Sequence, residues 1–235
     1  MNIINNKKSI VLLGTRPLSL KIYKLFKKQI VGVVKTTEKR KWWKNDINNT
    51  KKIKYLKLNQ LKNLNYDLGL SVNYNKKIKK NILKTAKIGF LNIHYSYKNY
   101  YRGRNIMFMS IINYPTQMAG FTIHWMDQNF DSGKILYTKK VIINKKDTSE
   151  TLYIKIEKEL VYFLKNNFIK NFDKFMILKP KLPLKKYLYF KKKKFRPFIE
   201  KYLKKNNNKD NKIRIIRALT FKNYNKKLIS KLNRI

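Results

Sequence analysis

The sequence predicts an α/β protein with a mainly parallel sheet, helices on both faces and a small C-terminal extension. Short apolar runs alternate along the chain with segments whose apolar residues recur at helical spacing. Of the 235 residues, 43% are hydrophobic and 14% aromatic, which is enough apolar material for a buried core. No stretch approaches the roughly 18 uninterrupted apolar residues that a membrane-spanning helix needs, so we expect no membrane span.

The first part of the chain predicts strands and helices in alternation. The apolar run at 9–14 ends in glycine, which is typical of a first buried strand. A helix is expected after Pro17, and a second one over 76–86, because their apolar residues lie on one face. The stretch 36–52 is polar and is expected to form a loop. The predicted strands of this part are 9–14, 30–35, 67–72 and 89–94, and the stretch 53–59 is expected to approach the sheet.

The second part continues the alternation and then changes in character. We expect a helix at 105–113 and two strands at 119–126 and 133–143. Asp147, followed three residues later by a glutamate, is typical of the N-cap of a long amphipathic helix. Beyond residue 170 the chain is rich in lysine and proline, with one short helix expected at 211–219. The predicted division is therefore a main domain at 1–170 and a lysine-rich extension at 171–235 that packs on it.

The composition limits the classes of function. The formal net charge is +45, from 57 basic and 12 acidic residues, which favours polyanionic partners. A bias toward A/T-rich codons is the competing explanation, because lysine, asparagine and isoleucine dominate the chain. The absence of cysteine excludes disulfides, thiolate catalysis and cysteine–zinc sites. The apolar run near the N-terminus is too short for a signal peptide, so we expect a cytoplasmic protein.

The candidate catalytic residues are the few imidazoles and carboxylates that stand out from this composition. His94 follows Asn92 by two residues at the end of a predicted strand. His124, the only other histidine, lies in the strand 119–126, and Asp131 follows it in the next turn. Ligands of parallel sheets bind beyond the carboxyl ends of the strands. An amide, an imidazole and a carboxylate meeting there could polarise a carbonyl group and transfer a proton.

The run from Gly89 to Leu136 resembles the signature of the folate-dependent formyltransferases. The resemblance rests on the order and spacing of four pieces: an Asn-x-His strand end, a Ser-containing loop closing in Arg-Gly, a Gly-x-Thr-x-His strand and an Asp-x-Gly turn. It extends more weakly over about residues 9–165. It implies a Rossmann-like formyltransferase fold and a catalytic set of Asn92, His94 and Asp131. One departure is Ser-Tyr-Lys-Asn at 96–99, where the family usually has Ser-Leu-Leu-Pro.

The resemblance also implies a formyl donor, 10-formyltetrahydrofolate, and direct transfer without a metal ion. His124 is expected either to face the folate or to be structural. Arg102 with Gly103 is either an anion contact beside the acceptor or a simple turn, and Trp42 is either a stacking platform or a packing residue. The other residues expected to border the pterin, mostly through backbone groups, are Val72, Asn73, Tyr74, Asp127, Gln128, Asn129 and Phe130.

Three functions remain open: formyl transfer to one of two acceptors, or a role without catalysis. We favour the amine of a nucleotide-linked 4-amino-4,6-dideoxy sugar, because the tail and the Trp42-Trp43 pair look most like the sugar N-formyltransferases. The alternative enzyme is a shortened methionyl-tRNA formyltransferase, which the charge supports, although such enzymes commonly lack the imidazole of His124. The alternative from another class is a catalytically degenerate RNA-binding module. A homodimer is left open.

Overall fold

The computed structural model describes residues 8–36, 47, 53–116, 118–190, 195–205, 208–222 and 225–232. The chain divides into two compact units, and each unit is assembled from three separate stretches. The first unit comprises Met1–His94, Ile123–Tyr137 and Phe163–Leu182, and the second comprises Tyr95–Thr122, Thr138–Tyr162 and Pro183–Ile235. The predicted boundary after residue 170, with an extension that packs on the domain before it, stays a prediction. None of the helices in the described ranges combines the length and apolar character that a membrane crossing requires.

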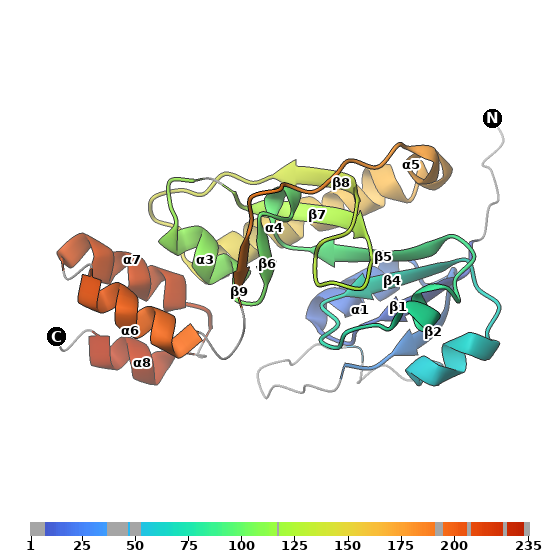
Figure 1. Ribbon diagram of the computed structural model, residues 1–235, viewed down its shortest axis with the longest axis horizontal. Helices are drawn as coiled ribbons and strands as arrows, with labels where there is room; N and C mark the ends of the chain where they lie inside the picture. The colour runs from blue at the N-terminus through green and yellow to red at the C-terminus, as the bar shows by residue number, and fades with distance from the viewer. Residues whose placement is uncertain are drawn as a thin grey trace. The chain divides into compact units, whose positions relative to one another are not determined.

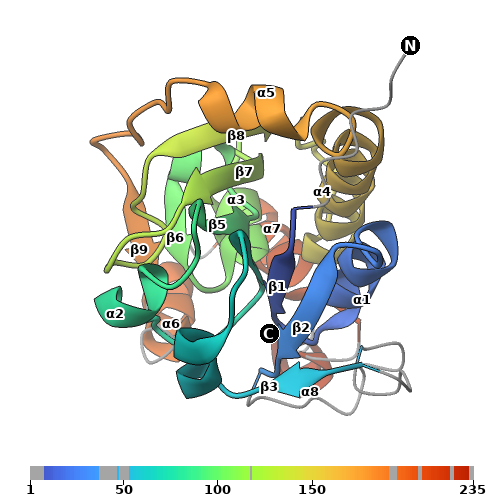
Figure 2. The same cartoon turned by 90° about the vertical axis from the view of Figure 1, so that its right-hand side faces the viewer.

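The main sheet has seven strands in the order β3-β2-β1-β4-β5-β7-β8 (Figure 2). The neighbours among the first five strands of that order pair in parallel, which confirms the predicted mainly parallel sheet. Parallel pairing places the carboxyl ends of β4 and β5 at the same edge of the sheet. The strands are β1 Ile10–Leu13, β2 Ile30–Val34, β3 Tyr55–Leu56, β4 Leu68–Val72, β5 Gly89–His94, β7 Gly120–Trp125 and β8 Ile135–Lys140.

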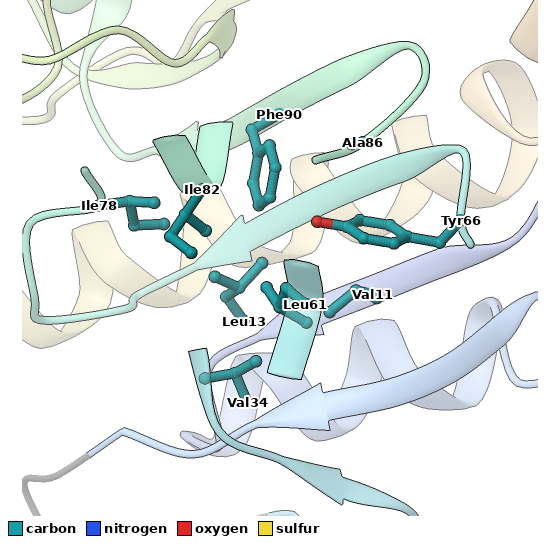
Figure 3. Packing of buried hydrophobic residues seen from close by; sticks show 9 residues of the cluster. All are labelled: Val11, Leu13, Val34, Leu61, Tyr66, Ile78, Ile82, Ala86 and Phe90. Atoms are coloured by element: carbon teal, nitrogen blue, oxygen red, sulfur yellow. The ribbon is translucent and has the colours of Figure 1, made fainter. Parts of the chain in front are cut away.

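In the first unit, helices cover both faces of the sheet (Figure 2). Helix α1 buries Leu18 and Ile22 and carries a proline at its start, where a missing N–H costs nothing. On the other face, Leu61 and Ile82 pack with side chains of β1, β2 and β5 (Figure 3). Each fully buried side chain of this kind contributes roughly 1.5–3 kcal/mol. The helices are α1 Pro17–Leu25, η2 Leu58–Asn63, α2 Lys80–Leu83, η4 Leu164–Phe168 and α5 Phe172–Ile177.

The helix predicted over 76–86 is shorter than expected, because α2 spans only Lys80–Leu83. Its C-terminal end is set by Thr85, whose hydroxyl donates to the carbonyl of Ile82 and also contacts the Tyr66 hydroxyl. Ile78 is buried in the same core cluster although it precedes the helix. The spacing of the apolar residues therefore predicted correctly which side chains pack in the core, but it predicted a helix that is too long.

The second unit combines a small parallel sheet with a group of helices (Figure 1). Residues 101–103 form strand β6, which pairs with β9. A simple turn, one of the two interpretations of Arg102-Gly103, is therefore wrong. Helix α7 contacts α3, α6 and α8, and it confirms the helix predicted at 211–219. The elements are η3 Tyr97–Asn99, β6 Tyr101–Gly103, α3 Ile106–Ile112, α4 Ser149–Phe163, β9 Leu188–Phe190, α6 Phe195–Lys205, α7 Lys209–Leu219 and α8 Lys226–Leu232.

The cap of the long helix α4 lies one residue later than predicted. The hydroxyl of Thr148 accepts from the N–H of Thr151 at 3.2 Å, and the Thr148 N–H donates back to the Thr151 hydroxyl at 2.9 Å. The carboxylate of Asp147 instead accepts from the N–H of Asn144 and from the ammonium of Lys155. Asp147 therefore closes the turn before the helix, and the Thr148 hydroxyl satisfies the free N–H of Thr151.

Asp67 joins the beginnings of β4 and β1, and it makes the stability of the fold sensitive to acid. The N–H and the hydroxyl of Ser9 donate to its Oδ2 at 2.8 and 2.9 Å. The backbone hydrogen bond from Ser9 lowers the pKa of Asp67 below the usual 3.8. A carboxyl group whose pKa is lowered by folding stabilises the fold above that usual value, and its contribution is lost as the pH falls through the folded-state pKa.

We therefore expect Asp67→Asn to lower the free energy of unfolding by about 1 kcal/mol at pH 7. The difference from the parent protein should shrink as the pH is lowered through 4 toward 3, because Asp67 itself becomes protonated there. Urea unfolding of both proteins across this pH range measures the difference. A difference that stays constant with pH would show that the ionised carboxylate is not what stabilises this junction.

Candidate active site

Asn92 and His94 occupy alternate positions on β5, so their side chains leave the same face of the strand. Asn92 is half-buried and His94 is buried. Strand β5 lies between β4 and β7, and Asn92 is in register with Ser71 of β4. The two side chains are thus held at the carboxyl end of an interior strand, where the backbone is fixed by neighbours on both sides.

Asp131 reaches the same place from the loop between β7 and β8. It is 9% exposed and adopts a left-handed backbone conformation with φ of 53°, which aspartate tolerates better than most residues. The start of this loop is bonded to β5, because the Met126 N–H donates to the Phe90 carbonyl at 2.8 Å. Further along, Oδ1 of Asp127 accepts from the Ser132 hydroxyl at 2.6 Å. These bonds fold the loop back and direct the Asp131 carboxylate toward β5.

One carboxylate oxygen is the meeting point of the three predicted catalytic side chains. The Asn92 amide donates from Nδ2 to Oδ1 of Asp131 at 3.1 Å. The same Oδ1 lies 3.5 Å from Nδ1 of His94, within ion-pair distance. Asn92 and His94 therefore both meet Asp131 within the first unit, although Asp131 lies up to 39 positions away in the sequence.

His124 is a fourth member of this cluster. It is 2% exposed, and its Nε2 lies 3.1 Å from Nδ2 of Asn92 and 3.8 Å from Oδ1 of Asp131. Its Nδ1 lies 2.8 Å from the carbonyl oxygen of Trp125. The two readings of His124, facing the folate or structural, did not include this contact with the Asn92 amide.

A pocket of the first unit opens beside the cluster and is lined by Asn92, His124 and Asp131. Of the residues expected to border the pterin, Tyr74, Asp127, Asn129 and Phe130 also line it, whereas Val72, Asn73 and Gln128 do not. The lining is apolar and aromatic on one part and polar on another, which suits a heteroaromatic ligand. The remaining lining residues, which the sequence did not single out, are Ser71, Lys76, Lys77, Ile78 and Met126.

The missed residues lie in β4, follow its end or begin the loop after β7. Ser71 could have been found from the sheet order, because it is the register neighbour of Asn92. Burial raises the pKa of Tyr74, so the phenol stays neutral at this pocket. Among the described residues, no group of three or more histidine, aspartate or glutamate side chains is arranged to hold a metal ion.

Similarity to known proteins identifies the family to which this chain belongs. The sequence pattern of the formyl transferase family matches residues 5–164, more than half of the chain. The chain belongs to the formyl transferase family. A methionyl-tRNA formyltransferase from Buchnera aphidicola is 38% identical over 112 residues, which are 46% of this chain and 34% of that protein.

One further relative has a sugar in its name, and one solved structure contains a nucleotide-linked amino sugar. The GDP-perosamine N-formyltransferase of Brucella melitensis is 37% identical over 91 residues, 39% of this chain and 35% of that protein. Both sequence matches thus span about a third of the relative's length. The N-formyltransferase from Helicobacter canadensis, solved with folinic acid and dTDP-3-aminofucose, shares the fold with a TM-score of 0.71 and 19% identity. The overlap covers 92% of this chain and 82% of that one.

The loop that departs from the formyl transferase pattern has its own local explanation. Lys98 and Asn99 both have left-handed backbone conformations, with φ of 50° and 53°. Proline is restricted to φ near −65°, so the usual proline could not occupy the position of Asn99. Ser96 retains a structural role, because its hydroxyl accepts from the N–H of Tyr101 at 2.8 Å. The substitution is therefore consistent with the conformation that this loop adopts.

Of the three residues predicted to bind the acceptor, two lie among the described residues. Arg102 is buried in the second unit, where it donates to the carbonyl of Asn99 at 3.2 Å and its guanidinium lies 3.7 Å from the ring centre of Tyr187. Gly103 ends β6 with φ of 87°. Trp42 lies outside the described residues. The roles of Arg102, Gly103 and Trp42 in binding the acceptor stay predictions.

Proposed function

We propose that this protein is a 10-formyltetrahydrofolate-dependent N-formyltransferase that acts on the amine of a nucleotide-linked 4-amino-4,6-dideoxy sugar. The observation that carries the proposal is the contact of Asn92, His94 and Asp131 beside a pocket, in a chain of the formyl transferase family. An amide donor, an imidazole and a carboxylate at one point match what formyl transfer to a neutral amine requires.

The pocket of the first unit fits the pterin of the folate donor in its chemistry. Tyr74, Met126 and Phe130 offer apolar surface to a flat ring, and Asp127 and Asn129 offer hydrogen-bonding groups. Val72, Asn73 and Gln128 adjoin this lining in the sequence and are proposed to contribute backbone groups. The donor, when bound, supplies a formyl carbon that is open to attack by an amine.

His94 and Asp131 are proposed to handle the proton that the amine loses. The Asp131 carboxylate lies beside Nδ1 of His94, so it orients the ring and favours a proton on that nitrogen. The other ring nitrogen can then accept the proton that the attacking amine loses and return it to the folate nitrogen, as the bond from that nitrogen to the formyl carbon breaks. A preorganised donor facing the carbonyl oxygen on which negative charge develops contributes roughly 3 kcal/mol, or about two decades in rate.

Asn92 is the proposed donor to that carbonyl oxygen. Its Nδ2 carries two hydrogens, and the structure directs one to Asp131 and the other to His124. Donation to the reacting carbonyl therefore requires that one of these two hydrogen bonds be exchanged. The amide is held in place before the exchange, which limits the reorganisation that the reaction must overcome.

The choice of a nucleotide sugar is supported by the extent of the fold. The overlap with the Helicobacter canadensis N-formyltransferase leaves out only 8% of this chain, so it includes most of the residues beyond 164. His124 also favours the sugar branch in the resemblance. The net charge of +45 would attract the diphosphate of such an acceptor. We further propose that the enzyme acts in the cytoplasm, and a homodimer remains to be tested.

Methionyl-tRNA is the second candidate acceptor. Two observations favour it: the 38% identity to the Buchnera enzyme and the strongly positive charge. Neutralisation of phosphates supplies much of the affinity of proteins for tRNA. A catalytically degenerate RNA-binding module would share the charge but would have no need of a contact among Asn92, His94 and Asp131.

A parallel assay separates these acceptors. The protein is incubated with 10-formyltetrahydrofolate and either a dTDP-linked 4-amino-4,6-dideoxy sugar or charged initiator tRNA, and the formylated product is quantified. We expect turnover on the amino sugar at least tenfold faster than on the tRNA, and no product without acceptor. Turnover on the tRNA alone would replace the sugar in this proposal. Tight RNA binding without any turnover would favour the non-enzymatic alternative.

A further inference from the structure

The ring of His124 has a defined hydrogen-bonding pattern. Its Nδ1 lies 2.8 Å from the Trp125 carbonyl oxygen, and a carbonyl oxygen only accepts, so Nδ1 carries a hydrogen. In the neutral ring Nε2 then has a lone pair, and it faces the Asn92 amide nitrogen at 3.1 Å. The Asp131 carboxylate lies 3.8 Å from Nε2. Nε2 is therefore an acceptor for an amide hydrogen of Asn92.

The orientation of the Asn92 amide is fixed because its Nδ2 has two hydrogen-bond acceptors. A single hydrogen bond to Asp131 would let the Asn92 amide swing about the line between Nδ2 and Oδ1. A second bond to His124 fixes the amide plane and places both hydrogens, which excludes the flipped amide that would direct an oxygen at Asp131. His124 is buried and Asn92 is half-buried, which limits the access of water to the contact.

We propose that His124 is a positioning residue that sets the orientation of the Asn92 amide and yields one of its hydrogens during formyl transfer. Hydrogen bonds to an ionised acceptor are roughly twice as strong as neutral ones. The bond to Asp131 is thus kept, and the hydrogen held by His124 is the one that turns to the reacting carbonyl oxygen. This inference rests on the proposed function for its kinetic consequence, while the orientation itself can be measured without activity.

A kinetic comparison tests the role in turnover. His124→Leu removes the acceptor, whereas His124→Gln offers an amide oxygen that can accept from Asn92. We expect His124→Leu to lower kcat about tenfold with little change in the KM of the folate, and His124→Gln to restore most of the loss. Ile123→Val, a buried change on the same strand pointing the other way, is the control and should leave kcat unchanged.

The outcomes separate positioning from a folate contact and from a purely structural role. A rise in the folate KM at constant kcat would mean that His124 contacts the folate, which would overturn the proposal. Equal losses in His124→Leu and His124→Gln would also overturn it, because an acceptor would then make no difference. Thermal unfolding of each variant shows whether the fold is retained.

Nitrogen NMR of the imidazoles tests the orientation directly. The chain has only two histidines, so a His94→Gln variant assigns the signals of His124. We expect His124 to carry its hydrogen on Nδ1, and we expect Asn92→Ala to shift the Nε2 signal while Nδ1 stays bound to the Trp125 carbonyl. A hydrogen on Nε2 would overturn the proposal, even if the protein proves to be an active formyltransferase. Conversely, the expected signals in a protein without turnover would leave the orientation standing and refute the proposed function.

Discussion

Replacing Asp131 by asparagine is expected to lower kcat for formyl transfer by about three orders of magnitude. One oxygen of Asp131 accepts from Asn92 and lies beside Nδ1 of His94, so the change removes the charge that organises both side chains. His94→Ala should have a comparable effect, because it removes the group that exchanges the proton. Steady-state kinetics with the folate and the amino-sugar nucleotide measure both variants.

The Asp131→Asn variant should keep its fold, which makes the kinetic result interpretable. Asparagine tolerates the left-handed backbone of position 131 as well as aspartate does. Asp210→Asn is the control: it makes the same chemical change at an exposed position in the first turn of α7, and Asp210 is not among the residues that line the pocket. We expect a loss of kcat of less than about tenfold in this control. A loss as small as this in Asp131→Asn would contradict a catalytic role for Asp131.

Gly133→Ala is expected to have the largest effect on stability, with a loss of roughly 2–4 kcal/mol in the free energy of unfolding. A Cβ at Gly133 would lie far inside van der Waals contact with the Trp125 carbonyl oxygen and 2.8 Å from its carbon. Both are backbone atoms, and the Trp125 N–H is bonded to the Lys134 carbonyl at 2.9 Å, so neither strand end can move cheaply.

The same substitution should also reduce activity, because the Trp125 carbonyl holds Nδ1 of His124. Gly32→Ala is the matched control, since a Cβ there meets mainly the flexible end of the Leu56 side chain. Chemical denaturation of both variants measures the difference. If Gly32→Ala destabilises the protein as much as Gly133→Ala, the close approach of the two backbones does not account for the glycine at 133.

The sheet could be predicted from the sequence because each buried strand is a short apolar run. The runs at 9–14, 30–35 and 67–72 correspond closely to β1, β2 and β4. Strand β6 could not be found this way, because its partner β9 lies more than 80 residues away in the chain and both strands are only three residues long. Pairing over such a distance leaves no local pattern.

The C-terminal helices were only partly predictable. Helix α6 was missed because Pro197 lies inside it, and an internal proline usually argues against a helix. Pro197 is the third residue of α6, in the first turn, where the missing N–H has no partner to lose. Phe195 and Phe198 of this helix pack edge-on against Phe108 of α3, a contact that the lysine-rich sequence conceals.

Within the candidate site, strand ends were predictable and side-chain pairings were not. The structure brings Asn92, His94 and Asp131 together, as expected from strands that end at one edge of the sheet. The bond between Asn92 and His124 depends on which ring nitrogen of His124 carries a hydrogen, and that depends on the backbone carbonyl of Trp125. No residue type or spacing indicates such a carbonyl in advance.

The most direct test of the central claim follows the formyl carbon itself. The protein is mixed with 10-formyltetrahydrofolate labelled with carbon-13 in the formyl group and with the amino-sugar nucleotide, and carbon NMR records where the label goes. The account predicts a new formamide signal on the sugar with the parent protein, and no such signal with a variant in which Asn92, His94 and Asp131 are all alanine. Label that appears only as free formate, or a formamide formed equally fast by the triple variant, would contradict it.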